Sequence, residues 1–93
     1  MEISYDPAKN EHNIRERGLS FERAADFEFE TAVHFEQIRG GEPRIISAGY
    51  LDNRLHVLCY QETAEGIRVI SFRKANIREA RKYGKAKTKT IDR

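Results

Sequence analysis

The chain has 93 residues, of which 39% are hydrophobic and 34% are charged, and its formal net charge is +2. This length allows one domain with a modest core, and the apolar content lies outside the range of disordered chains. No apolar run approaches the roughly 18 residues that a membrane-spanning helix needs, so we expect a cytoplasmic protein with no part in a membrane.

The small net charge conceals an uneven distribution along the chain. Residues 73–93 contain nine Lys or Arg and two acidic residues, which gives +7, whereas residues 1–72 carry a net −5. A cluster of Lys and Arg is typical of nucleic-acid-binding proteins, although it is also found on purely solvated surfaces. The composition leaves both interpretations open.

The first thirty residues predict a short strand and two helices. Residues 2–6, "EISYD", alternate as a strand does, and Asp6 followed by Pro7 is a typical helix start. This first helix runs to about Arg17 and ends at Gly18. Ser20 is the expected N-cap of a second helix, whose buried face would contain Phe21, Ala24, Ala25 and Phe29.

From residue 31 the pattern changes to short β-rich runs. Four strands are expected, at residues 31–37, 44–51, 54–61 and 67–73. Asn76 then precedes a last helix at 77–83 that ends at Gly84, and residues 85–93 form a basic tail that we expect to be flexible. The prediction is one α+β domain at residues 1–84 in the order β-α-α-β-β-β-β-α, an antiparallel sheet with its helices on one face.

The strand at 67–73 and the helix after it carry the candidate phosphate site. Both faces of the strand are apolar in the middle and cationic at an end. Guanidinium groups grip two phosphate oxygens at once, and an ammonium group adds a compact charge. The expected cluster comprises Arg68, Arg73 and Lys74, joined by Arg44 from a neighbouring strand and by Arg78, Arg81 and Lys82 from the last helix.

The first helix offers a second set of polar residues. Lys9, Asn13 and Arg17 are spaced so that they share one side of the helix, as a ligand-binding ridge or as a solvated face. His12 lies among charged residues, a position more typical of a surface histidine than of a catalytic one.

Two residues of the last helix also have more than one interpretation. Glu79 is three residues after Asn76, where an acidic side chain commonly caps a helix, so capping ranks before catalysis. Tyr83 shares its side of the helix and could pack on the sheet or point toward a substrate. The sequence has no phosphate-binding glycine loop and no His or Cys at metal-ligand spacing, so we expect neither a cofactor nor a metal.

Two stretches, "YDPAKNEHNIRERGLSFERAADF" and "RVISFRKANIREARKY", closely resemble the BrnT family of ribonuclease toxins from bacterial type II toxin–antitoxin systems. The resemblance covers Ile3 to Tyr83. Two positions depart from the usual family pattern: Tyr5 stands where Trp is usual, and Arg17 where His is common before the glycine. An arginine cannot exchange protons at neutral pH, but it can bind phosphate.

The resemblance implies a RelE-like fold and a metal-independent endoribonuclease that cleaves messenger RNA, free or on the ribosome, and so inhibits translation. It also implies a BrnA-like ribbon-helix-helix antitoxin, which binds operator DNA. We expect Arg44, Arg68 and Arg73 to stabilise the transition state, with Lys9 and Lys74 in proton transfer. Glu79, Tyr83 and His12 are further catalytic candidates, and the RNA-binding candidates are Arg17, Asn13, Arg78, Arg81 and Lys82.

Two other functions fit the same sequence. The first is a module that binds RNA or DNA through the basic residues without cutting it, and the second is a protein that regulates its antitoxin and has no nuclease activity. An adjacent antitoxin gene and growth arrest by the protein alone would favour the ribonuclease.

Overall fold

The computed structural model describes the backbone of residues 1–91 and the side chains of residues 1–84. The elements follow the predicted order, and the second helix is a short 3-10 helix. The α+β class is therefore confirmed. In chain order the elements are β1 (Glu2–Ser4), α1 (Pro7–Arg17), η1 (Phe21–Asp26), β2 (Val33–Arg39), β3 (Glu42–Leu51), β4 (Arg54–Glu62), β5 (Gly66–Lys74) and α2 (Ile77–Ile91).

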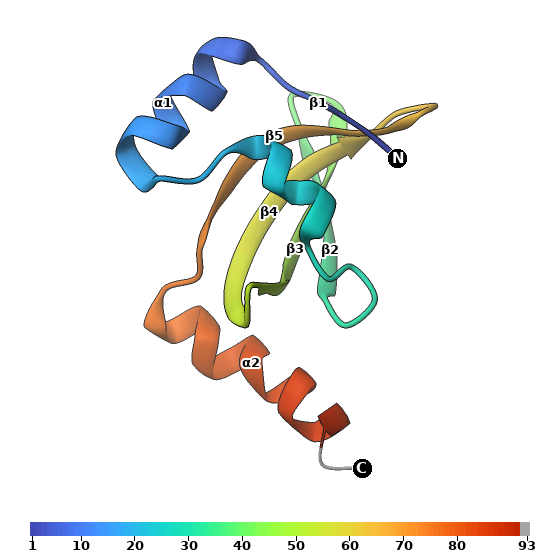
Figure 1. Cartoon of the computed structure of the whole chain (residues 1–93). Coiled ribbons are helices and arrows are strands. Elements are labelled where there is room, and N and C mark those ends of the chain that lie inside the picture. Colours follow the sequence, from blue (N-terminus) through green and yellow to red (C-terminus); the bar gives the residue numbers. More distant parts are fainter. Residues whose placement is uncertain (92–93) are drawn as a thin grey trace.

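The five strands form one sheet in the spatial order β1-β5-β4-β3-β2 (Figure 1). Strands β2 to β5 are antiparallel neighbours, as their short connections predict. Strand β1 adds to the outer edge of β5 in parallel, with Ile3 opposite Ile67, so the sheet is mixed. Because β1 pairs only with residues 66–68, the rest of the β5 edge has no strand partner.

Local signals fix the ends of the first helix. The Asp6 side chain accepts a hydrogen bond from the backbone N–H of Ala8, and Pro7 occupies the first helical position. Gly18 ends the helix with φ 64°, in the left-handed region that glycine adopts without strain. Ser20 caps η1 through its hydroxyl, which accepts from the N–H of Glu22. Each of these caps agrees with the sequence prediction.

The main core lies between η1 and one face of the sheet. Phe21, Ala24 and Phe27 pack against strand residues that include Leu58 and Phe72, both fully buried. Ala25 was expected in this buried face but is exposed. The tighter winding of a 3-10 helix changes which side chains share a face, and Phe27 takes the buried position instead.

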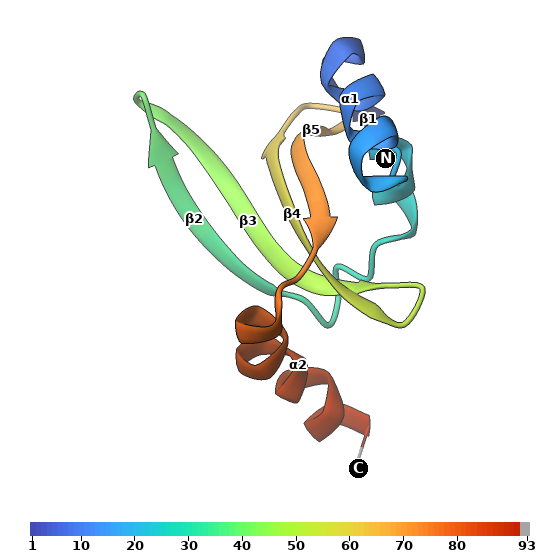
Figure 2. The same ribbon diagram turned by 90° about the vertical axis from the view of Figure 1, so that its left-hand side faces the viewer.

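Helix α2 packs on the opposite face of the sheet, which differs from the expected placement of every helix on one face. The Tyr83 ring contacts Phe35 with centroids 5.4 Å apart, and the Tyr50 hydroxyl donates to the carbonyl of Gly84 at 3.3 Å. Tyr50 points away from its buried neighbour Leu51, since successive strand residues face opposite sides. Figure 2 shows α2 below the bent sheet, with the β2–β3 hairpin projecting to one side.

The predicted end of the last helix at Gly84 is wrong, because α2 continues to Ile91. Most of the expected flexible tail at 85–93 therefore belongs to a helix, and its residues 92–93 lie outside the described part of the chain. None of the helices that the structure describes combines the length and apolar composition of a membrane span.

Candidate active site

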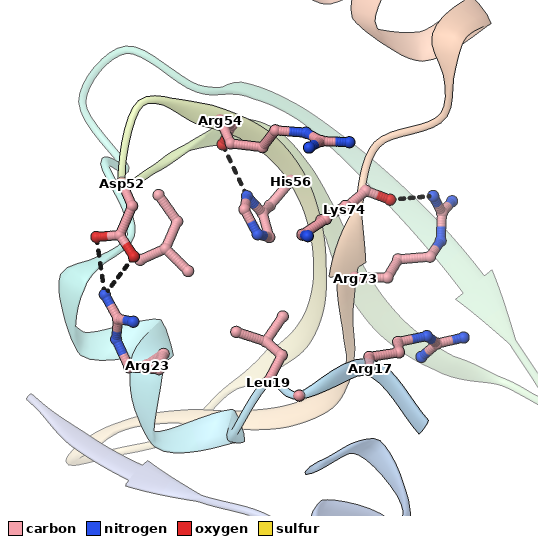
Figure 3. Close-up of a pocket in the computed structure, with 10 residues that line it drawn as sticks. Arg17, Leu19, Arg23, Asp52, Arg54, His56, Arg73 and Lys74 are labelled. Atoms are coloured by element: carbon pink, nitrogen blue, oxygen red, sulfur yellow. Dashed lines mark hydrogen bonds and ion pairs between the residues drawn. The ribbon is translucent and has the colours of Figure 1, made fainter. Parts of the chain in front are cut away.

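A cavity of about 580 Å³ opens where the C-terminal end of β5 meets the end of α1 and the β3–β4 turn (Figure 3). Its walls come from segments far apart in the sequence. The α1–η1 connection forms one side, the β3–β4 turn and the start of β4 form another, and the end of β5 forms the third. The lining residues are Arg17, Gly18, Leu19, Arg23, Leu51, Asp52, Arg54, His56, Arg73 and Lys74.

The cavity is strongly cationic, with five basic side chains and one acidic side chain in its lining. The acid is already neutralised, because Arg23 Nη2 donates to both carboxylate oxygens of Asp52 at 2.9 and 3.0 Å. Within residues 1–84, neither Arg54 nor Lys74 has an acidic partner. Such unpaired cations side by side favour an anionic ligand.

His56 lies in the wall of this cavity, on β4 directly opposite Lys74 on β5. The residue is only 4% exposed, and its ring lies against the ring of Phe72. Burial lowers the pKa of His56 below the ordinary value of 6.5, and the nearby charges of Arg54 and Lys74 lower it further, against the raising effect of the backbone hydrogen bond. The imidazole is therefore neutral at pH 7.

The tautomer of this imidazole follows from its hydrogen bond. Nδ1 of His56 is 2.7 Å from the backbone carbonyl oxygen of Arg54. A carbonyl oxygen can only accept, so Nδ1 carries the proton and Nε2 has the free lone pair. Nε2 has no hydrogen-bond partner within residues 1–84. Figure 3 shows this ring between the Arg54 carbonyl and the Lys74 amino group. A neutral imidazole with a free lone pair can accept a proton, which makes His56 a candidate general base.

Arg73 connects the cavity to helix α2. Its two terminal nitrogens donate to the two Glu79 oxygens at 2.8 and 2.9 Å. Glu79 also accepts from the N–H of Asn76, and Asn76 Oδ1 accepts in return from the N–H of Glu79, so the predicted helix cap is confirmed. The bond from Arg73 lowers the pKa of Glu79 to about 2. A carboxylate held ionised in this way is poorly suited to exchange protons near neutral pH.

Replacing Glu79 with glutamine is expected to remove a pH-dependent contribution to stability. Because folding depresses the Glu79 pKa from 4.5 to about 2, its contribution is present above pH 4.5 and is lost as the pH falls toward 2. The ion pair is partly solvated, so we expect an effect on the order of 1 kcal/mol. Urea unfolding of both proteins at pH 7 and pH 2 measures it. An equal difference at the two pH values would contradict the assignment.

The expected convergence of four cations at one rim is only partly found. Arg73 and Lys74 line the cavity, but Arg68 lies at the other end of β5 beside a different depression. Arg44 lies on β3, with its Nε buried and without a hydrogen-bond partner in the described part of the chain. Arg44 and Arg68 therefore do not belong to this site.

The three residues predicted to form a polar ridge on α1, which are Lys9, Asn13 and Arg17, lie in different surroundings. Arg17 lines the cationic cavity, whereas Lys9 and His12 line a smaller cavity on the other side of Arg17. Asn13 is only 3% exposed, and its amide donates to the backbone carbonyls of Leu19 and Phe72, each at 2.9 Å. Its Oδ1 accepts from Arg17 at 2.7 Å. Asn13 therefore joins α1 to the β5 edge, and we leave it out of the RNA-binding set.

The candidates on α2 lie outside the cavity. Tyr83 packs against Phe35, with the Lys82 ammonium 5.4 Å from the centre of the Tyr83 ring. Exposed cations surround a separate shallow depression beside Ile77; they are Arg78, Arg81 and Lys82. These residues could contact a long nucleic acid, but they do not reach the cavity.

Sequence reasoning missed His56 and Arg54. His56 sits inside an apolar run, where a histidine is usually a core residue, and Arg54 follows a turn. Counting back from the β4–β5 turn would place His56 opposite Arg73, because a register shift between Cys59 and Tyr60 moves its partner by one residue to Lys74. The pairing of the two strands therefore brings His56 to the cationic end of β5, but the sequence does not give its exact partner. Within the described residues, no group of three or more His, Cys, Asp or Glu side chains could hold a metal ion.

This is a small α+β domain in which one cavity is lined by three cations without an acidic partner in residues 1–84: Arg17, Arg54 and Lys74. These features define a class of protein suited to polyanionic ligands. The profile of the family described as "Ribonuclease toxin, BrnT, of type II toxin-antitoxin system" matches residues 5–79. The chain belongs to this BrnT family, which confirms the resemblance of its sequence. The family implies an RNA substrate and an antitoxin partner.

Comparison with solved structures agrees with this assignment. The chain is similar to the Brucella abortus ribonuclease toxin, BrnT, whose crystal structure was solved at 1.1 Å resolution. The TM-score is 0.61 and the sequence identity 27%, over 82% of this chain and 97% of that chain. A comparison with curated proteins finds no match.

Proposed function

We propose that the cationic cavity is the active site of an endoribonuclease that cleaves RNA through the ribose 2′-hydroxyl without a metal ion. The observation that carries this proposal is the placement of His56, whose Nδ1 is 2.7 Å from the Arg54 carbonyl oxygen and whose ring lines the same cavity as the side chains of Arg54 and Lys74. Family membership supplies the reaction class, and the cavity supplies a base and positive charge in one place.

In the proposed mechanism, a phosphodiester of RNA binds between Arg17 and Arg54. His56 Nε2 accepts the proton of the 2′-hydroxyl, whose oxygen attacks the adjacent phosphorus. The two guanidinium groups stabilise the negative charge of the phosphorane. Lys74 donates a proton to the departing 5′-oxygen, so the P–O5′ bond breaks. The products are a 2′,3′-cyclic phosphate and a 5′-hydroxyl. The enzyme is restored when His56 releases its proton to solvent and Lys74 takes one up.

The same proposal extends to the cellular role. Cleavage of messenger RNA in the cytoplasm would inhibit translation, and a BrnA-like ribbon-helix-helix antitoxin would neutralise the enzyme and carry it to operator DNA. The ribonuclease family and its antitoxin partner support this role.

A cleavage assay with a matched pair of arginine variants tests the proposal. Arg54 and Arg39 are both exposed, and only Arg54 lines the cavity. In excess EDTA, the wild type and Arg39→Ala should cleave single-stranded RNA at the same rate. Arg54→Ala should be slower by about 10²-fold to 10³-fold, the usual cost of removing one transition-state donor.

Three results would contradict the proposal. Loss of wild-type cleavage in EDTA would show that a divalent metal ion takes part. Full activity of Arg54→Ala would place the reaction elsewhere on the molecule. RNA binding without any cleavage would favour the non-catalytic binding module.

A further inference from the structure

A second cavity, of about 310 Å³, lies between α1 and the middle of β5. Its interior differs from that of the active site. Ala8 and the apolar side chains of Phe21 and Ile70 form much of its wall, while the charged Lys9 and the imidazole of His12 contribute from α1. The cavity therefore combines an apolar interior with polar groups from the helix. Its volume is at the lower end of the range for ligand pockets.

Arg17 lines both cavities and so places them next to each other. Its guanidinium is held by Asn13 Oδ1 at 2.7 Å, and Asn13 is in turn fixed by two backbone carbonyls. A ligand with its anionic group at Arg17 can therefore place one part in the cationic cavity and a neighbouring part in the apolar one.

A nucleotide chain has this alternation of phosphate and flat, largely apolar base. Unpaired bases bind proteins through stacking on aromatic and apolar surfaces, whereas the bases of a duplex are hidden in their own stack. We infer that the second cavity binds an unpaired nucleobase of the substrate RNA, next to the phosphate held in the cationic cavity. This inference rests on the proposed function and specifies its substrate as single-stranded.

A cavity-filling variant tests the inference without touching the active site. Ala8 is exposed on α1, so Ala8→Leu keeps a strong helix former and fills the second cavity. Ala25→Leu is the matched control, because Ala25 is also exposed and lines neither cavity. Unchanged circular dichroism and thermal unfolding would show that both variants fold normally.

The ligand is a fluorescent five-nucleotide RNA that is 2′-O-methylated at every position, so that it cannot be cleaved, together with five versions that each lack one base. Fluorescence anisotropy gives the Kd. Removing the base that enters the cavity should weaken binding to the wild type by about tenfold, within the usual range for one stacked base. Ala8→Leu should bind the intact RNA about tenfold more weakly and should no longer respond to loss of that base. Ala25→Leu should behave as the wild type.

Wild-type affinity of Ala8→Leu would overturn the inference, and so would a variant that still loses affinity on removal of the same base. In that case the second cavity would remain available to another partner, such as a side chain of the antitoxin. The cleavage assay fails or succeeds independently of this one. Binding as predicted with no cleavage of ordinary RNA would refute the proposed catalysis and leave the base site standing.

Discussion

His56→Asn is expected to lower the rate of RNA cleavage by about 10²-fold to 10⁴-fold, the usual contribution of a general base. Asparagine keeps a side-chain N–H close to the position of Nδ1, where it can still donate to the Arg54 carbonyl. It has no acceptor in place of Nε2. The variant therefore removes the proposed base while keeping the hydrogen bond that positions it. Single-turnover cleavage of RNA at saturating protein measures the effect on the chemical step.

His34→Asn is the matched control for this variant. His34 also lies on a strand and uses its ring nitrogens in structural hydrogen bonds, to Ser47 Oγ at 2.6 Å and to the Phe29 carbonyl at 3.1 Å. It lines neither cavity. The control should cleave RNA at the wild-type rate per folded molecule. A fully active His56→Asn would exclude His56 as the base.

The pH dependence of cleavage follows from the same group. Because burial lowers the His56 pKa below 6.5, the imidazole stays neutral as the pH falls from 8 to 6.5. The rate should therefore be limited by protonation of His56 only below pH 6.5. Stability should fall over the same acidic range, because the unfolded chain takes up a proton on His56 before the folded protein does.

Asn13→Ala is expected to destabilise the fold by about 2–4 kcal/mol, because it leaves the buried carbonyls of Leu19 and Phe72 without their donor. This is a large share of the stability of a small domain, and it corresponds to a fall in Tm of roughly 10–20 °C. Differential scanning calorimetry measures it. Arg17 also loses its partner, so the remaining folded protein should bind RNA more weakly.

Glu16→Ala, at an exposed position of the same helix, controls for a general effect on α1 and should change Tm little. Asn13→Asp gives a sharper comparison. It keeps the size of the side chain and the acceptor for Arg17, but it directs carboxylate oxygens at two carbonyls. It should be at least as unstable as Asn13→Ala. A stable Asn13→Asp would mean that the amide does not join α1 to the sheet.

The features predicted correctly from the sequence are those set by near neighbours in the chain. Asp6 with Pro7, Ser20, and Asn76 with Glu79 are caps whose hydrogen bonds span three residues or fewer. The family resemblance rests on motifs that are also continuous in the chain.

The features that were not predicted depend on contacts between distant segments. His56 becomes a candidate base only because strand pairing places Lys74 opposite it and because the α1–η1 connection closes the cavity around it. Arg68 and Arg73 are both basic residues of β5, but they lie near opposite ends of the strand and therefore line different cavities. A glycine is a common helix end, so Gly84 predicted that α2 would stop there, yet the helix continues to Ile91. The hydrogen bond from the Tyr50 hydroxyl to the Gly84 carbonyl joins segments far apart in the chain, and the local sequence does not predict it.

The central claim is that His56 and the surrounding cations cut RNA by activating its own 2′-hydroxyl. Analysis of the RNA ends by mass spectrometry, after cleavage in EDTA, tests this claim most directly. We predict 2′,3′-cyclic phosphate and 5′-hydroxyl ends, and no cleavage next to a nucleotide whose 2′-hydroxyl has been replaced by hydrogen. Products with 3′-hydroxyl and 5′-phosphate ends would show that water attacks the phosphorus, which would contradict the proposed mechanism.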